Sequence, residues 1–275
     1  MTSTSFPSIS DRLQADAVTL RYDERTISKD LSVSIPGGSF TVIVGPNACG
    51  KSTLLRALSR LLFPSEGAVI LDGHDIYAMA AKEVARRLGL LPQSATAPDG
   101  ITVADLVARG RYPHQSFLRQ WSWADEEAVA RAMAATRVTD LSDRPVDELS
   151  GGQRQRVWVA MVLAQETPIL LLDEPTTFLD IAHQIELLDL LSGLNEEGRT
   201  IVAVLHDLNH ACRYASNLIA MKAGVIVASG RPDEIVTADI VATVFNLPAI
   251  VIPDPVTGTP MIVPKTRRHK ELFHE

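Results

Sequence analysis

The stretch GPNACGKST, Gly45 to Thr53, decides the fold of this chain. It matches the pattern Gly-x4-Gly-Lys-Ser, follows the apolar run Phe40 to Val44, and precedes LLRALSRLLF, which has helical spacing. In a strand–loop–helix unit of this kind, backbone N–H groups curl around phosphates and the lysine adds a fixed positive charge. A chance glycine-rich turn would lack this complete context. The sequence therefore predicts a phosphate-binding loop for ATP or GTP.

Each residue of this loop is a candidate nucleotide-binding residue: Gly45, Pro46, Asn47, Ala48, Cys49, Gly50, Lys51, Ser52 and Thr53. The Ser52 hydroxyl is also a candidate Mg²⁺ ligand. Alanine disfavours a positive φ, so we expect an ordinary backbone angle at Ala48. Cys49 lies close to Lys51 and to a helix start, which favours a reactive thiol. We expect alkylation of Cys49 to abolish nucleotide turnover, with protection by bound ATP.

The composition is that of a globular, acidic chain. Of the 275 residues, 46% are hydrophobic and 21% charged, and 26 basic against 33 acidic residues give a net charge of −7. This balance argues against a nucleic-acid partner. The two cysteines, one inside the phosphate loop, favour a reducing cytosol, and MTSTSFPSISDR shows no signal-peptide pattern. Apolar runs such as Val157 to Ala164 fall short of the about 20 residues that span a bilayer.

The pattern along the chain predicts an α/β fold. Residues 15–40 alternate apolar and polar, which indicates an antiparallel β layer. Unbroken apolar runs at Ile169 to Leu172 and Ile201 to Leu205 are typical of buried parallel strands. Long helical patterns dominate between them and the phosphate loop. We expect a core of residues 15–93 and 166–245, a helical subdomain of residues 94–165, and a C-terminal tail of residues 246–275.

Two acids end the predicted strand in ILLLDEP, Ile169 to Pro175. The carboxyl edge of a parallel sheet is where nucleotides bind. Asp173 would hold Mg²⁺ directly or through water, and Glu174 would orient and deprotonate an attacking water. The alternative is a turn that is merely rich in acids, which the upstream phosphate loop disfavours.

A second glycine-rich segment is LSGGQRQR, Leu149 to Arg156. Ser150 precedes an apolar-periodic helix, in the position of an N-cap. One interpretation is an ordinary capped helix. The other is a second anion site, made by backbone N–H groups and the Ser150 hydroxyl at a helix N-terminus.

Together, the phosphate loop, the acidic strand end and LSGGQ resemble the nucleotide-binding subunit of an ABC transporter, over about residues 15–244. The resemblance implies a P-loop NTPase ABC cassette: a mostly parallel core sheet, an antiparallel β layer and an inserted α-helical subdomain. Many members have glycine where Ala48 stands. The family hydrolyses ATP with Mg²⁺.

The resemblance also implies roles for single residues. Tyr22 would stack on adenine, although it could simply pack in the β layer. Gln93 would contact Mg²⁺ and link the core to the helical subdomain. Asp180, in TTFLD, would communicate across a dimer. His206, at a strand end, would contact the γ-phosphate and the attacking water, so that Glu174, His206 and Gln93 are the expected catalytic residues.

The sequence LSGGQ is the signature motif of ABC ATPases. In this family the signature of one subunit completes the ATP site of another. The resemblance therefore implies that Ser150, Gly151, Gly152 and Gln153 close over ATP held by Lys51 of a second copy. With one loop and one signature, the chain would form a head-to-tail dimer with two equal sites. ATP would hold the dimer together and hydrolysis would release it.

The segment after Gln93 would couple hydrolysis to a membrane partner. Its phrase VARGRYPHQ, together with TTFLD and VFNLPAIVIPDPVTGTPMIVP, resembles subunits that energise import of iron–siderophores, haem and cobalamin. Residues 109–114 could instead be a solvated turn. The resemblance implies polytopic permease subunits, an indirectly acting substrate-binding protein, and a peripheral position at the cytoplasmic face of a bacterial inner membrane.

Two other classes of protein share some of these motifs. A soluble ABC ATPase acting on nucleic acid or ribosomes would share the cassette, but such proteins commonly carry two cassettes, coiled coils or basic arms. A small-molecule P-loop kinase would share Lys51 and Asp173 and have no use for LSGGQ. Iron–siderophore import remains the leading interpretation, with haem, cobalamin or another substrate as alternatives.

Overall fold

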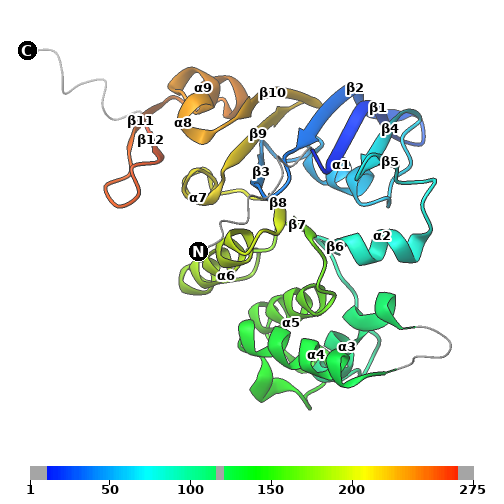
Figure 1. Cartoon of the computed structure of the whole chain (residues 1–275). Helices are drawn as coiled ribbons and strands as arrows, with labels where there is room; N and C mark the ends of the chain where they lie inside the picture. Colours follow the sequence, from blue (N-terminus) through cyan, green and yellow to red (C-terminus); the bar gives the residue numbers. More distant parts are fainter. Residues whose placement is uncertain (1–10, 116–120, 266–275) are drawn as a thin grey trace, which may run out of the picture.

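We describe the fold from a computed structural model, which covers residues 11–115 and 121–265. A six-stranded sheet forms the centre of the molecule, with a four-stranded sheet beside it, a group of helices below it and a two-stranded hairpin at its far end (Figure 1). Among the described residues, no helix combines the length and apolar character needed to cross a bilayer.

The central sheet has the strand order β10-β9-β3-β8-β7-β6. The pairs among β3, β6, β7, β8 and β9 are parallel, and β10 runs antiparallel to β9. All residues of β3, β7 and β8 are buried, as their unbroken apolar runs predict. The strands are β3 (Phe40–Val44), β6 (Leu88–Leu91), β7 (Ile169–Asp173), β8 (Thr200–Val204), β9 (Asn217–Lys222) and β10 (Val225–Gly230).

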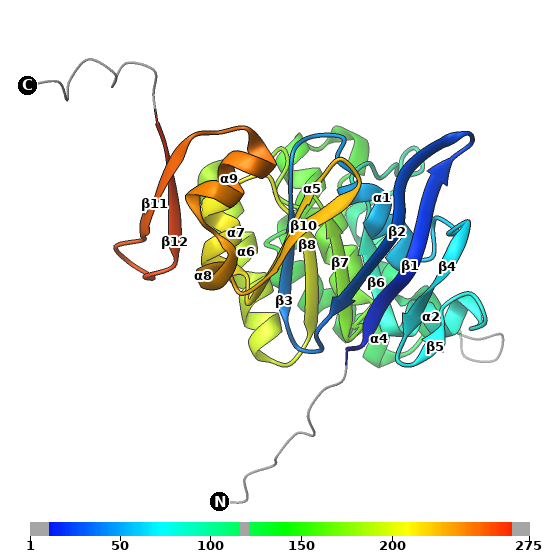
Figure 2. The same cartoon turned by 90° about the horizontal axis from the view of Figure 1, so that it is seen from above.

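The second sheet is the expected antiparallel layer, with the order β2-β1-β4-β5. Helix α1 (Lys51–Leu58) packs between it and the central sheet, because Leu54, Leu55 and Leu58 share one buried cluster with apolar residues of both sheets (Figure 2). The strands are β1 (Leu13–Tyr22), β2 (Arg25–Ile35), β4 (Glu66–Leu71) and β5 (His74–Asp75).

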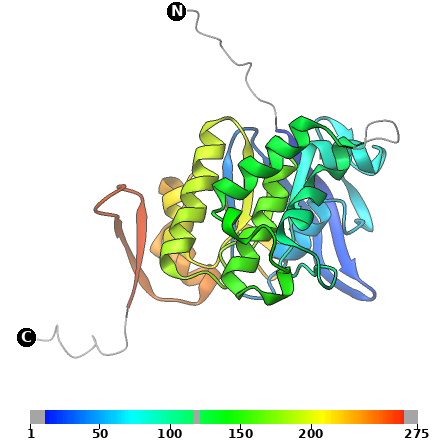
Figure 3. The same ribbon diagram turned by 90° about the horizontal axis from the view of Figure 1, so that it is seen from below.

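Helices cover the lower face of the central sheet (Figure 3). Among the described residues between β6 and β7, helices and turns replace strands, apart from one isolated bridge between Thr102 and Pro145. Residues 116–120 of the proposed subdomain 94–165 lie outside the described residues. The helices are α2 (Ala81–Arg87), α3 (Val103–Ala108), α4 (Trp123–Ala135), α5 (Gly151–Ala164), α6 (Ile181–Glu196) and α7 (Leu208–Tyr214), with 3₁₀ turns η1 (Arg109–His114), η2 (Thr139–Leu141) and η3 (Val146–Glu148).

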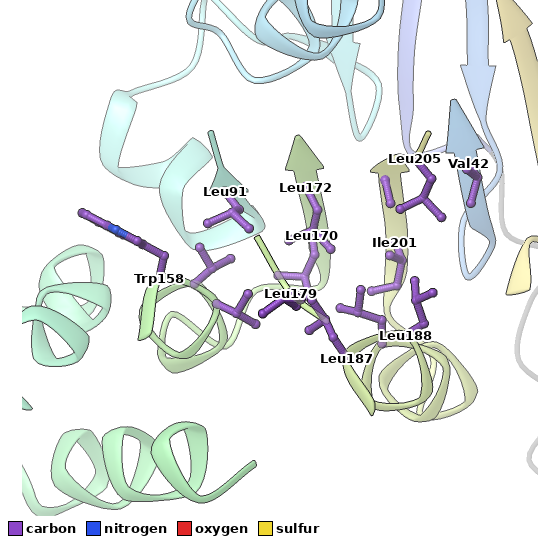
Figure 4. Close-up of a cluster of buried hydrophobic side chains, with 14 of the residues drawn as sticks. Val42, Leu91, Trp158, Leu170, Leu172, Leu179, Leu187, Leu188, Ile201 and Leu205 are labelled. Carbon is purple, nitrogen blue, oxygen red and sulfur yellow. The ribbon is translucent and has the colours of Figure 1, made fainter. Parts of the chain in front are cut away.

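The core below the sheet joins these helices to the strands (Figure 4). Leu187 and Leu188 of α6 and Trp158 of α5 pack in one cluster with Leu170 of β7 and Ile201 of β8. The removal of this apolar surface from water is the main stabilising contribution. The carboxyl ends of β3, β6, β7 and β8 are thereby fixed along one edge.

The chain continues through α8 (Pro232–Ile235) and α9 (Ala238–Phe245) into a hairpin of β11 (Ala249–Pro253) and β12 (Pro260–Pro264). Asn209 of α7 bonds both the N–H and the carbonyl of Ile262, and Arg213 donates to Asp254 at 2.6 Å. This bond and two backbone N–H groups lower the pKa of Asp254 to about 2. Residues 266–275 of the expected tail lie outside the described residues.

Candidate functional site

The phosphate loop connects β3 to α1. Lys51, the first residue of α1, is 5% exposed, and its Nζ donates to the carbonyls of Gly45 and Pro46 at 2.9 Å each. Gly45 has a φ of 155°, and a Cβ atom there would lie 2.2 Å from the carbonyl oxygen of Met221, so another residue would not fit. The loop is therefore tied to β9 on one side and to its own lysine on the other.

The expectation for Ala48 is wrong. Its φ is 59°, in the left-handed region that costs a residue with a Cβ atom about 1–2 kcal/mol. The chain turns at this point, where the N–H of Cys49 donates to the carbonyl of Pro46 at 3.4 Å. Ala48 lines the cavity described below, so the strain lies at the candidate site itself.

Cys49 does not face this cavity. It is 4% exposed and belongs to the buried cluster around α1, with its Sγ under Gly45. Because the thiol is covered, we now expect N-ethylmaleimide to label Cys49 slowly in the folded chain and quickly in urea. Mass spectrometry of the labelled peptide measures both rates. If the native protein is labelled rapidly and ATP slows this labelling, Cys49 is a reactive thiol at the nucleotide site, as the sequence predicted.

Asp173 ends β7 and faces the loop. Its Oδ1 accepts a hydrogen bond from Ser52 Oγ at 3.0 Å, and the residue is 3% exposed. Burial raises the pKa of Asp173, the Ser52 bond lowers it, and the neighbouring Glu174 charge raises it, with a net increase. A hydroxyl and a carboxylate are oxygen donors of the kind that Mg²⁺ takes.

Glu174 and His206 are brought together from the ends of β7 and β8. The Nε2 atom of His206 lies 2.8 Å from Oε1 of Glu174. With an ionised Glu174, that nitrogen carries the proton and donates it. Thr177 Oγ1 lies 3.4 Å from the other carboxylate oxygen, a contact that no sequence motif indicates. Glu174 also has a φ of 54°, so a second strained residue lies at this edge.

One cavity of about 500 Å³ collects most of the predicted residues. This volume lies within the range of small-molecule sites. Its lining includes Arg25 and Ile27 of β2, which follow Tyr22 closely in the sequence but carry no motif. Predicted residues in the lining are Tyr22, Asn47, Ala48, Gly50, Lys51, Ser52, Thr53, Gln93, Glu174 and His206.

Tyr22 is 38% exposed at the rim of this cavity, and its hydroxyl accepts a hydrogen bond from Arg56 Nη1 at 3.2 Å. A base stacked on an aromatic ring contributes about 1–3 kcal/mol. We therefore expect Tyr22→Ala to weaken ATP binding about tenfold, with Tyr22→Phe close to wild type. Titration with a fluorescent ATP analogue measures the change. Equal affinity of the alanine variant would leave Tyr22 a packing residue of β1.

The signature residues lie elsewhere. Ser150 caps α5 in a capping box: Gln153 N donates to Ser150 Oγ at 3.3 Å, and Ser150 N donates to Gln153 Oε1 at 3.1 Å. These two residues, Gly151 and Gly152 line a separate cavity of about 610 Å³, together with Asp180. Within one chain, the structure thus separates Asp180 and the signature from Lys51.

The Lys51 cavity and the signature cavity are the two half-sites of this chain. Together with the fold, they define an ATP-binding cassette. The ABC transporter family model matches residues 28–177. The chain is 61% identical to the ferric enterobactin transport ATP-binding protein of Escherichia coli K12, over 93% of this chain and 95% of that protein. It is 55% identical to a probable siderophore transport system ATP-binding protein of Bacillus subtilis, over 93% of each. This chain therefore belongs to the ABC transporter family, as an ATP-hydrolysing cassette.

Solved structures agree with this assignment. A putative metal-chelate type ABC transporter in an inward-facing conformation matches with a TM-score of 0.80 at 26% identity, over 94% of this chain and 99% of that chain. A dimeric bacterial ABC transporter cassette matches with a TM-score of 0.72 at 28% identity, over 80% and 98%. The predicted fold class is confirmed.

Proposed function

We propose that this chain is the ATP-hydrolysing subunit of an ABC importer that energises uptake of an iron–siderophore. The observation that carries the proposal is the 61% identity, across nearly the whole chain, to a ferric enterobactin transport subunit. A petrobactin import subunit of Bacillus anthracis is 52% identical over 95% of this chain. A cobalamin import subunit of Halobacterium salinarum is 41% identical and covers less of this chain, which favours the siderophore over cobalamin.

The cavity lining supports separate roles for its residues at the nucleotide. ATP supplies a transferable γ-phosphoryl group whose charge Mg²⁺ neutralises. Tyr22 stacks on the adenine, and Lys51 and the loop N–H groups bind the phosphates. Ser52 and Asp173, which are hydrogen-bonded at 3.0 Å, would hold the cation together with Gln93. The described residues contain no cluster of three or more His, Cys, Asp or Glu that could hold a metal.

Glu174 takes the proton of the attacking water. His206, 2.8 Å from its Oε1, fixes the carboxylate and reaches the same cavity. The hydrogen bond to His206 keeps one oxygen occupied, so the base has a defined orientation before nucleotide binds. A positioned base of this kind contributes about 10²- to 10⁴-fold to a rate.

The two separate half-sites support a head-to-tail pair of identical chains. In that pair, Ser150–Gln153 and Asp180 of one copy complete the cavity around Lys51 of the other. Polytopic permease subunits are the further partners, and a substrate-binding protein acts through them. The chain then lies peripherally at the cytoplasmic face of a bacterial inner membrane. Residues 91–95, with Gln93 among them, line a groove of about 350 Å³ where the permease would couple.

Uptake by intact cells tests the proposal. A strain that lacks this gene is expected to lose accumulation of radiolabelled ferric siderophore and to regain it with the wild-type gene, but not with Lys51→Ala. Labelled vitamin B12 and haem serve as comparators. Loss of vitamin B12 or haem uptake alone would assign another cargo. Normal uptake of all three, with ATPase activity stimulated by nucleic acid, would favour the soluble class.

A further inference from the structure

Phe178 is an unusual residue for its position. It lies in TTFLD, in the segment that leads from Glu174 to α6, and its side chain is 76% exposed. Its φ is 67°, a left-handed angle that bulky residues rarely adopt. An exposed ring on a strained backbone contributes little to the stability of the fold, so a role other than stability is needed to explain Phe178.

The neighbours of Phe178 are the glycines of the signature. A Cβ atom at Gly151 would meet the Cβ of Phe178 at 3.4 Å, and one at Gly152 would meet its carbonyl oxygen at 3.3 Å. The segment is also bonded to α5, because Gln155 Nε2 donates to the carbonyl of Pro175 at 3.0 Å. Phe178 and its backbone therefore lie directly against the start of α5.

Phe178 also lies between two cavities, and it contributes to the lining of each. It lines the signature cavity, with Ser150, and the groove that contains Gln93. The chain from Glu174 to Phe178 is five residues long, so the residue that deprotonates water is linked to the signature through Phe178. Phe63 offers a comparison: it is 69% exposed and packs edge-to-face on Tyr77 at 4.6 Å, without a positive φ.

We propose that Phe178 is a positioning residue that holds the start of α5, Ser150–Gln153, in the orientation that closes over ATP on a second copy of this chain. The side chain of Phe178 lies against Gly151 and its carbonyl oxygen against Gly152, and these contacts limit the tilt of α5 relative to the Glu174 segment. The proposal rests on the proposed function, since it requires that the signature act on a partner's ATP.

ATP-dependent dimerisation of Glu174→Gln tests this role. Sedimentation velocity over a range of ATP concentrations measures the dimer fraction in the parent and in Phe178→Ala and Phe178→Leu made in the same background. We expect the alanine variant to need on the order of tenfold more ATP for half-maximal dimer, because a smaller fraction of its molecules holds the signature in the orientation that binds the partner's ATP. Leucine, which keeps apolar bulk, restores part of the loss.

Two readouts exclude an effect on ATP binding by the monomer and a general effect of losing an exposed aromatic ring. Binding of a fluorescent ATP analogue to the monomer, at low protein concentration, stays at the parent value because Phe178 does not line the Lys51 cavity. Phe63→Ala, the matched exposed aromatic, dimerises like the parent. Phe178→Asn removes the ring and tolerates the left-handed angle, so it tests the role of the ring if the alanine variant unfolds.

The outcomes distinguish the inference from the function on which it rests. Dimerisation of Phe178→Ala and Phe178→Asn at the parent's ATP concentration would overturn the role of Phe178 and leave the proposed function standing. Failure of the Glu174→Gln parent to dimerise at saturating ATP would instead contradict the proposed pairing of half-sites.

Discussion

Replacing Glu174 by glutamine is expected to lower the ATP turnover rate by about 10²- to 10⁴-fold and to leave ATP affinity unchanged. The amide has the size of the carboxylate and can still contact His206, but it cannot accept a proton from water. In the structure both carboxylate oxygens have neighbours, His206 at 2.8 Å and Thr177 at 3.4 Å, so the substitution perturbs little of the surroundings. The substitution does not touch the phosphate loop, which we propose binds the nucleotide.

Phosphate release measures turnover, and size-exclusion chromatography with ATP measures the dimer. The variant is expected to accumulate as an ATP-bound dimer, because hydrolysis no longer separates the two copies. Glu126→Gln, an exposed glutamate in the first turn of α4, is the matched control and should turn over normally. Wild-type hydrolysis by Glu174→Gln would remove Glu174 as the base.

The residues around Glu174 were predictable because they stand at the ends of apolar runs. Parallel strands bring their carboxyl ends to one edge, so Asp173 could be assigned to the nucleotide site from its place after a buried strand. The role of His206 came from the family resemblance, because a histidine at a strand end is by itself more often structural. The positive φ of Ala48 was not predictable in this way. It belongs to a turn from Pro46 to Cys49, closed by a backbone hydrogen bond of 3.4 Å, which the residue types in the loop do not indicate.

Arg111, in the helical part, is a second residue whose surroundings the sequence could not predict. Its motif, RGRYPH, is compatible in sequence with a partner contact or with a solvated turn, and for Arg111 neither is correct. The residue is 5% exposed and lies inside the molecule, whereas its neighbour Tyr112 is 74% exposed. A sequence pattern cannot distinguish the two, since burial depends on α4 and α5, which close over η1.

The environment of Arg111 is a buried ion-pair network. Its Nε donates to Asp125 at 2.8 Å, and its Nη1 donates to the carbonyl of Ala164 and to Glu166 at 2.8 Å each. The side chains of Arg111 and Asp125 are 6% and 5% exposed. One guanidinium therefore connects η1 to the start of α4, to the last residue of α5 and to Glu166 beyond it.

We expect Arg111→Ala to lower the free energy of unfolding by about 3–5 kcal/mol, because removal of one partner leaves buried acid without its counter-charge. Urea unfolding followed by circular dichroism measures the loss. Arg137→Ala is the matched control: Arg137 pairs with Glu186 at the surface, 67% and 40% exposed, where a pair contributes about 0–1 kcal/mol. Equal losses in the two variants would mean that burial does not set the contribution of Arg111.

The pH dependence gives the same prediction a second, independent test. Burial alone would raise the pKa of Asp125 and of Glu166, but hydrogen bonds and charge from neighbours, Arg111 among them, outweigh it and lower both pKa values. A lowered carboxyl pKa adds stability above the unfolded value, about 4, and that stability is lost as the pH falls through the folded value. Without Arg111 both pKa values rise. The stability that these two carboxylates contribute is therefore smaller in Arg111→Ala, so the difference in stability between the wild type and this variant should narrow as the pH falls below about 4. Arg137→Ala leaves Asp125 and Glu166 paired, so its difference from the wild type should not narrow in this way.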